Sequence, residues 1–198
     1  MIIILHGDNS FLSKRKLGEI ISQHRSRHKT GLSFFSFDPA LDGFDFSDFK
    51  SAVETVAMFS EKKLIVLKSL VKNIPIDYLK EKDLKNDSET IVVFYESAAL
   101  DVQKNKDIRW LFEKPAISQE SRNLDGEKLH SWIRGEVKQR GGEISQSATG
   151  LLATSCGRDL WQLSNEIDKL IAFSPAITDE NVSLLTRKDS ETDVFGAV

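Results

Sequence analysis

The sequence has little cysteine, no long apolar run and no marked excess of charge. Its 198 residues include one cysteine, Cys156, which excludes an internal disulfide and a cluster of thiolate metal ligands and suits a reducing compartment. No stretch approaches the roughly 18 consecutive apolar residues of a membrane span, and the apolar run at 2–5 is too short for a signal peptide. The net charge of -3 does not indicate a nucleic-acid-binding protein. We therefore expect a cytoplasmic protein that does not associate with membranes.

Hydrophobic residues make up 40% of the chain and include 12 phenylalanines, which is enough for one medium domain or two small ones. Through residues 1–123, apolar runs alternate with helical patterns. We predict strands at 1–6, 32–38, 62–68 and 90–96, and helices at 10–24, 47–58 and 76–83. Ser47 fits the N-cap of the second helix. Strands that alternate with helices favour an α/β fold, with a parallel sheet covered by helices on both faces.

The pattern becomes helical after residue 123. Apolar residues recur at helical spacing in four segments, at 124–142, 145–157, 159–173 and 177–188. Asp125 fits an N-cap, and the glycines at 141–142 and 157 fit helix ends. Residues 124–188 therefore predict a small all-helical domain. The last residues, 189–198, end in the apolar DVFGAV, which indicates that the chain continues into a longer protein.

The segment IIILHGDNSFLSKRK has the layout of a phosphate-binding loop, in which a strand runs through a glycine turn into a helix. A working loop needs GxxxxGK[ST], because its glycines let N–H groups approach the phosphates, its lysine reaches the outer phosphates and its hydroxyl holds Mg²⁺. Counted from Gly7, Leu12 replaces the second glycine, Ser13 the lysine and Lys14 the hydroxyl. Glu96 supplies a carboxylate at a strand end, but without a phosphate loop it fits a solvated strand end. We therefore predict no ATP hydrolysis, no cofactor and no metal.

No other catalytic set has a convincing spacing. The histidines are His6, His24, His28 and His130, and of these only His24 and His28 lie one helical turn apart. That pair could share a metal, but it lies among arginines and a lysine with no nearby carboxylate, which favours a solvated basic face. Cys156, next to a glycine, fits a small core residue.

Met58 and Phe59 close the predicted helix at 47–58. At about 100° per residue, Phe49, Val53 and Val56 share the core face, whereas Met58 projects to the opposite side. Phe59 lies near the rim of that face. Two large apolar residues at a helix end, at least one of them aimed away from the core, suggest an exposed anchor for a partner's pocket. Alternatively, the helix frays earlier and both side chains turn inward to seal the junction with the next strand.

Four segments, in their order and spacing, resemble one family. IIILHGDNSFLSKRKLGEII matches a strand–turn–helix opening, and MFSEKKLIVLK matches a Leu-Phe pair followed by basic residues and an apolar strand. GRDLWQLSNEIDKLIAF matches a second-domain helix that ends acidic-x-x-Lys-Leu, and ITDENVSLLTRKDSETDVFGAV matches the approach to a third domain. Together they resemble the delta subunit of bacterial DNA polymerase III, the clamp-loader subunit that opens the sliding clamp.

The resemblance implies an AAA+-like domain without ATPase activity at 1–123, a helical lid domain at 124–188 and the start of a truncated collar domain at 189–198. It implies a non-catalytic subunit of a DNA polymerase (nucleotidyltransferase) holoenzyme, which binds and opens the beta sliding clamp for loading on primed DNA. The implied partners are that clamp, the ATP-binding motor subunits and the delta-prime subunit. The family's clamp-binding Leu-Phe pair matches Met58-Phe59, with Phe59 in a hydrophobic pocket of the clamp.

Residues 14–29 hold six basic residues and one acidic residue, Glu19, which gives this stretch a charge of +5. The six are Lys14, Arg15, Lys16, Arg25, Arg27 and Lys29. They fit either a solvated helix face or a surface that contacts DNA or a neighbouring loader subunit, and phosphate contacts would depend on salt. Two other functions therefore stay open. One is a basic DNA-binding module, and the other is an AAA+-type ATPase in which Lys14 acts one position out of register.

Overall fold

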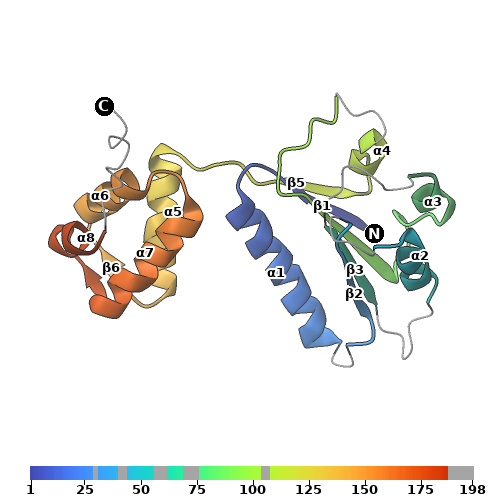
Figure 1. Cartoon of the computed structure of the whole chain (residues 1–198), viewed down its shortest axis with the longest axis horizontal. Helices are drawn as coiled ribbons and strands as arrows, with labels where there is room; N and C mark the ends of the chain where they lie inside the picture. Colours follow the sequence, from blue (N-terminus) through green and yellow to red (C-terminus); the bar gives the residue numbers. More distant parts are fainter. Residues whose placement is uncertain (29–30, 40–43, 56–61, 69–75, 104–107, 187–198) are drawn as a thin grey trace, which may run out of the picture. The chain divides into compact units, whose positions relative to one another are not determined.

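The computed structural model describes residues 1–28, 31–39, 44–55, 62–68, 76–103 and 108–186 (Figure 1). The chain divides into two compact units, residues 1–122 and 123–198. Each unit has its own secondary structure and its own set of buried apolar side chains.

The first unit contains a parallel sheet of five strands in the order β2-β3-β4-β1-β5. The strands are β1 (Ile2–His6), β2 (Phe34–Phe37), β3 (Lys63–Lys68), β4 (Thr90–Tyr95) and β5 (Ile117–Glu120). The central strands are continuous apolar runs, because both faces of a parallel sheet are covered. The predicted parallel sheet is confirmed. Strand β5 was not predicted, because its sequence ISQE has a single apolar residue.

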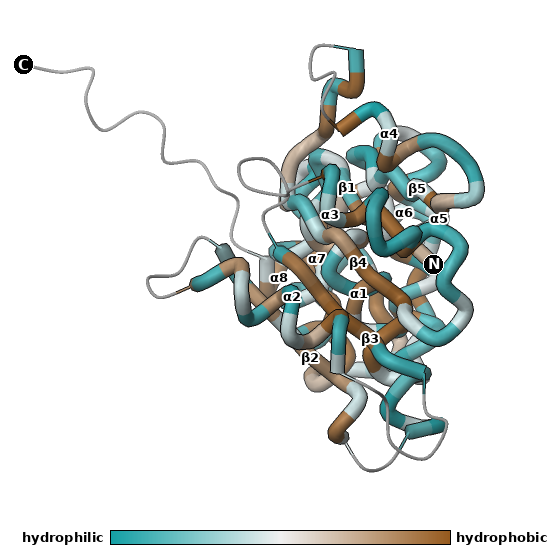
Figure 2. Tube along the Cα trace, turned by 90° about the vertical axis from the view of Figure 1, so that its right-hand side faces the viewer, coloured by the Kyte–Doolittle hydropathy of each residue, from teal (hydrophilic) through white to brown (hydrophobic). Residues whose placement is uncertain are grey.

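Helices cover both faces of this sheet, as predicted (Figure 1). Helix α1 (Ser10–Arg27) lies on one face, whereas α2 (Phe46–Glu54), α3 (Ile76–Glu81) and α4 (Arg109–Phe112) lie on the other. On the α1 side, Leu17 packs with the inward side chains of β1, β3 and β4. On the opposite side, Phe49, Leu79 and Leu111 pack with the alternate side chains of the same strands. Figure 2 shows β3 and β4 as hydrophobic stretches between these layers.

Helix α2 begins earlier than predicted. Asp45, rather than Ser47, is the N-cap, since its Oδ1 accepts the backbone N–H of Ser47 at 2.9 Å. Aspartate is a strong N-cap residue, and its charge is favourable at this end of a helix. The core face is as predicted where it is described, because Phe49 and Val53 are both buried.

Helix α2 also ends earlier than predicted. Its last residue is Glu54, and Thr55 takes an extended conformation with ψ of 125°. The prediction of one continuous helix through Met58 is therefore wrong. Met58, Phe59 and the predicted core residue Val56 lie outside the described residues.

The second unit is helical, as predicted, with one addition. Its helices are α5 (Gly126–Gln139), α6 (Gln146–Cys156), α7 (Leu160–Phe173) and α8 (Asp179–Leu185). Two short strands, β6 (Glu143–Ile144) and β7 (Ala176–Ile177), pair in parallel and were not predicted, because two residues carry no periodicity. Arg140 joins α5 to α7, since its guanidinium donates to the backbone carbonyl of Ser164 at 2.9 Å and lies 3.1 Å from Asp168.

Two smaller expectations concern this unit. Cys156 is buried at the end of α6, as expected for a small core residue. Asp125 occupies the N-cap position of α5, but its side chain makes no capping hydrogen bond.

Across the described ranges of the chain, no helix combines the length and the apolar character that crossing a bilayer requires.

Candidate functional site

The turn after β1 occupies the position of a phosphate-binding loop. Gly7 has φ of +130°, a backbone conformation that residues with a side chain rarely adopt. A Cβ at this position would lie 2.2 Å from the carbonyl oxygen of Ser121. The chain leaving β5 passes directly beside the turn, where the N–H of Ser121 donates to the carbonyl of His6 at 2.7 Å. Gly7 is therefore required by the packing of two backbone segments, without any need for a phosphate.

Two backbone N–H groups of this turn bind carbonyl groups of neighbouring segments. Gly7 N–H donates to the carbonyl of Ala98 at 3.0 Å, and Asn9 N–H donates to that of Ser121 at 3.0 Å. Asn9 caps α1, with its Oδ1 accepting Leu12 N–H at 3.1 Å. In a working phosphate loop, such N–H groups converge on phosphate oxygens. Here their hydrogen bonds hold the turn to its neighbours.

The three residues that depart from the phosphate-loop motif, Leu12, Ser13 and Lys14, differ in exposure. Leu12 is half-buried and Ser13, in the place of the phosphate-binding lysine, is fully buried with an unpaired hydroxyl. Lys14 is exposed. At the neighbouring strand end, Glu96 is half-buried and accepts the N–H of Ser97 at 3.0 Å. Within the described ranges, no three His, Cys, Asp or Glu side chains gather in a way that could hold a metal.

His6 at the end of β1 is buried, and sequence reasoning assigned it no role. Its Nδ1 accepts the backbone N–H of Leu100 at 3.4 Å, and its Nε2 lies 3.3 Å from the hydroxyl of Ser118 on β5. Burial lowers the pKa of His6, although the nearby carboxylate of Glu120 acts in the opposite direction. The neutral imidazole therefore bridges the segment after β4 to strand β5.

His24 contradicts the prediction of a solvated basic face. It is buried, because the same side of α1 that carries Leu17 packs on the sheet. Its Nε2 lies 2.8 Å from the backbone carbonyl of Lys62, which accepts the hydrogen bond, and its ring lies 4.6 Å from that of His28. His24 therefore holds the residue that precedes β3. His130, by contrast, is half-buried in the second unit, with Nδ1 3.9 Å from Glu127.

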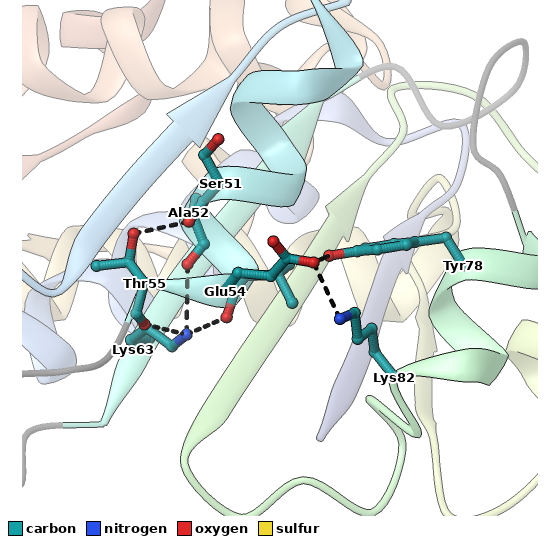
Figure 3. Close-up of polar contacts among 8 residues, drawn as sticks. Ser51, Ala52, Glu54, Thr55, Lys63, Tyr78 and Lys82 are labelled. Carbon is teal, nitrogen blue, oxygen red and sulfur yellow. Dashed lines mark hydrogen bonds and ion pairs between the residues drawn. The ribbon is translucent and has the colours of Figure 1, made fainter.

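The end of α2 is held by a buried lysine, as Figure 3 shows. Lys63, the first residue of β3, donates from Nζ to the backbone carbonyls of Ala52 at 3.3 Å, of Val53 and of Thr55 at 2.7 Å. These carbonyls are among the last of the helix, where no intrahelical N–H is available. Burial lowers the pKa of Lys63, while the charges of Asp87 and Glu89 oppose that change. A cation at the negative end of a helix is favourable.

A second contact holds α2 to α3. Glu54 Oε1 lies 2.9 Å from Nζ of Lys82 and accepts the hydroxyl of Tyr78 at 3.3 Å (Figure 3). The hydrogen bond from Lys82 lowers the pKa of Glu54, and burial together with Glu54 raises the pKa of Tyr78 to about 12. Glu54 and Lys82 are exposed, so this pair contributes less than the buried lysine.

The sequence contained a weak signal for Lys63. Two lysines, Lys62 and Lys63, precede the apolar run of β3, and a charged residue next to a buried strand often binds a local acceptor. The sequence did not show which lysine is buried: Lys62 is exposed, and Lys63 is 6% exposed. The pair Met58-Phe59 lies between the described residues Thr55 and Lys62.

The basic residues of α1 are mostly exposed. Lys14, Arg15, Arg25 and Arg27 are exposed, and Lys16 is half-buried and lies 3.1 Å from Glu19. Lys29, the sixth residue of this stretch, lies outside the described residues.

Two of these arginines lie over aromatic rings. Arg25 lies 4.9 Å from the ring centre of Phe34, and Arg15 lies 5.7 Å from that of Phe11. Lys14 and Arg25 are three turns apart, roughly 16 Å at 1.5 Å per residue. Exposed basic side chains are therefore distributed along the length of α1.

Comparisons with known proteins agree with this architecture. The structure of the Bacillus subtilis DNA clamp loader delta protein matches with a TM-score of 0.61 and 20% identity, over 94% of this chain and 58% of that one. Domain III of the Thermotoga maritima replication initiation protein DnaA matches with a TM-score of 0.52 and 14% identity, over 93% of this chain and 82% of that one. At these identities the likeness shows the fold, which is AAA+-like.

The match to the clamp loader protein is partial in length, since this chain spans 58% of it. No curated protein matches the sequence. A family model described as "DNA polymerase III, delta subunit" matches residues 4–110, which is more than half of the chain. The predicted family is therefore confirmed, and the chain belongs to the DNA polymerase III delta subunit family.

Proposed function

We propose that this chain is the clamp-loader subunit that binds the beta sliding clamp and opens it for loading on primed DNA. The observation that carries the proposal is the family match over residues 4–110. The chain acts without chemistry of its own, by binding the opened clamp more tightly than the closed one and so shifting that equilibrium. ATP enters through the motor subunits, and the delta-prime subunit completes the loader. Such a subunit acts in the cytoplasm.

The turn after β1 supports a role without nucleotide. Its N–H groups bind Ala98 and Ser121, and Ser13 is buried where a phosphate-binding lysine would reach outward. We assign residues 1–123 to an AAA+-like domain with this degenerate loop, 124–188 to a lid domain and 189–198 to the start of a collar domain.

The proposed clamp contact is Met58-Phe59, with Phe59 as the anchor in a hydrophobic pocket. The exposed cations of α1, including Lys14, Arg15 and Arg25, are proposed to contact DNA or a neighbouring subunit within the loader. A single aromatic anchor that fills a pocket commonly contributes 2 kcal/mol or more to binding, by order of magnitude about 30-fold in affinity.

The test is a calorimetric titration of the chain against the sliding clamp of the same organism. Replacement of Met58 and Phe59 by alanine is expected to abolish measurable binding and to leave the circular dichroism spectrum unchanged. A matched control replaces two exposed apolar residues of the second unit, Phe173 and Leu184, which are 57% and 71% exposed. Equal clamp affinity in the wild type and in the Met58/Phe59 variant would rule out the proposed contact.

A further inference from the structure

Lys63 is a buried cation whose three donors are all used. Its side chain extends from the first position of β3 to the end of α2, where the carbonyls of Ala52, Val53 and Thr55 accept its hydrogen bonds. An ammonium has three N–H groups and no acceptor, so three carbonyls satisfy it completely. Removing the ammonium would leave these carbonyls without their partner, which costs more than an ordinary surface contact.

The same residue is fixed in the sheet. Strand β3 pairs with β2 and with β4, and the backbone N–H of Lys63 donates to the carbonyl of Glu89 at 2.8 Å. The preceding residue, Lys62, is held by His24 of α1 through its carbonyl at 2.8 Å. The β3 end of this junction is therefore attached to the sheet and to α1, while the end of α2 is joined to β3 by the ammonium of Lys63 and by the apolar packing of Ala52 and Val53.

We propose that Lys63 is a positioning residue for clamp binding, because its ammonium holds the end of α2 against the start of β3 and so fixes the two ends of the connection that carries Met58 and Phe59. The proposal rests on the proposed function of that pair. Its chemical basis is pre-organisation: a binding segment whose ends are already fixed loses less conformational entropy when it binds.

The contact between α2 and α3 does not replace this anchor. The carboxylate of Glu54 binds Lys82 and Tyr78 on the other side of the helix, and both charged groups are exposed. An exposed pair is weak and is screened by salt. Without Lys63, the apolar packing of Ala52 and Val53 remains, but the carbonyl of Thr55 loses the hydrogen bond that ties it to β3.

The test replaces Lys63 by methionine, which keeps the length and the apolar stem of the side chain and removes the ammonium. The matched control is Lys85→Met. Lys85 is also buried, at 7% exposure, and donates to the carbonyls of Trp110 and, at 2.8 Å, of Glu113, which lie around the end of α4. Each variant loses one buried ammonium in the same unit, and urea unfolding measures the loss of global stability in both.

Clamp affinity is measured by calorimetry at a temperature where circular dichroism shows all variants folded. Lys63→Met is expected to weaken binding about tenfold, equivalent to about 1.4 kcal/mol, and Lys85→Met to leave it within twofold. Hydrogen exchange at the amide of Thr55, which is bonded to the carbonyl of Ser51 at 2.8 Å, should accelerate in Lys63→Met alone. If Lys63→Met does not fold, Lys63→Gln, which retains two N–H donors, takes its place.

The variants separate two kinds of failure. If the wild type does not bind the clamp, the proposed function fails. If the wild type binds and the Met58/Phe59 alanine variant binds equally well, the proposed contact fails and the positioning role of Lys63 fails with it. If that variant loses binding while Lys63→Met and Lys85→Met bind equally well, the proposed function stands and the role of Lys63 is overturned.

Discussion

Replacement of Gly7 by alanine tests why the turn after β1 retains a glycine. The new Cβ would lie 2.2 Å from the carbonyl oxygen of Ser121 and 2.6 Å from its nitrogen, both of which belong to backbone. Neither atom can move as the end of a side chain can. The chain beyond β5 would have to shift by roughly 1 Å to reach ordinary van der Waals contact, which begins at 3.4 Å for such a Cβ.

The cost has two parts. Holding alanine at a φ of +130° costs on the order of 1–3 kcal/mol. The shift also weakens two hydrogen bonds, from Ser121 N–H to His6 and from Asn9 N–H to Ser121, each of which contributes about 0.5–1.5 kcal/mol. We therefore expect the free energy of unfolding to fall by about 3 kcal/mol or more.

Gly18 provides the matched control. It lies in α1, where an added Cβ meets nothing within 4 Å, so alanine there should raise the free energy of unfolding by about 0.5–1 kcal/mol. Urea unfolding followed by circular dichroism measures both variants against the wild type. A Gly7→Ala variant whose stability lies within about 1 kcal/mol of the wild type would show that the backbone contact does not explain this glycine.

Two further predictions concern charge. Because the folded-state pKa of His6 is lowered, the unfolded state binds more protons, so the free energy of unfolding should fall as pH drops below about 6.5. In urea titrations at pH 7.5 and 5.5, the free energy of unfolding of His6→Gln should fall less between the two pH values than that of the wild type. Equal falls would refute the assignment of this pH dependence to His6. Replacement of Lys14 and Arg25 by glutamate, which reverses both charges, should weaken binding to duplex DNA. It should also reduce the slope of log binding constant against log salt concentration by about 2. The same charge reversal at Lys128 and Lys138 should leave the DNA affinity and the salt slope unchanged. An unaltered slope in the Lys14/Arg25 variant would exclude phosphate contacts by these two residues.

The sequence predicted the sheet well for a physical reason. The runs that form β1, β3 and β4 are buried on both faces, so their composition reports their environment directly. Strand β5 was missed because it is short, exposed and placed by hydrogen bonds with β1 rather than by its own side chains. Pairing of that kind leaves no local pattern in the sequence.

The end of α2 was predicted wrongly for a different reason. Its sequence favours a helix that continues past Glu54, but a lysine from the next strand binds the carbonyls near that point. A long-range hydrogen bond of this type cannot be read from periodicity. The same holds for His24, whose partner is 38 residues away along the chain. The Met58-Phe59 contact comes from family resemblance and stays a prediction.

The strand order has a consequence for how the chain folds as it is synthesised. Strand β1 lies between β4 and β5, so the first residue of either neighbour follows Ile2 by almost ninety residues or more. Translation at about 5–20 residues per second leaves the run IIIL unpaired for at least several seconds. Contacts of such high sequence separation also form slowly in refolding. Strand β1, an inner strand of the finished sheet, is thus left without a strand partner for a long part of synthesis, and an apolar run in that state is prone to aggregate or to bind a chaperone.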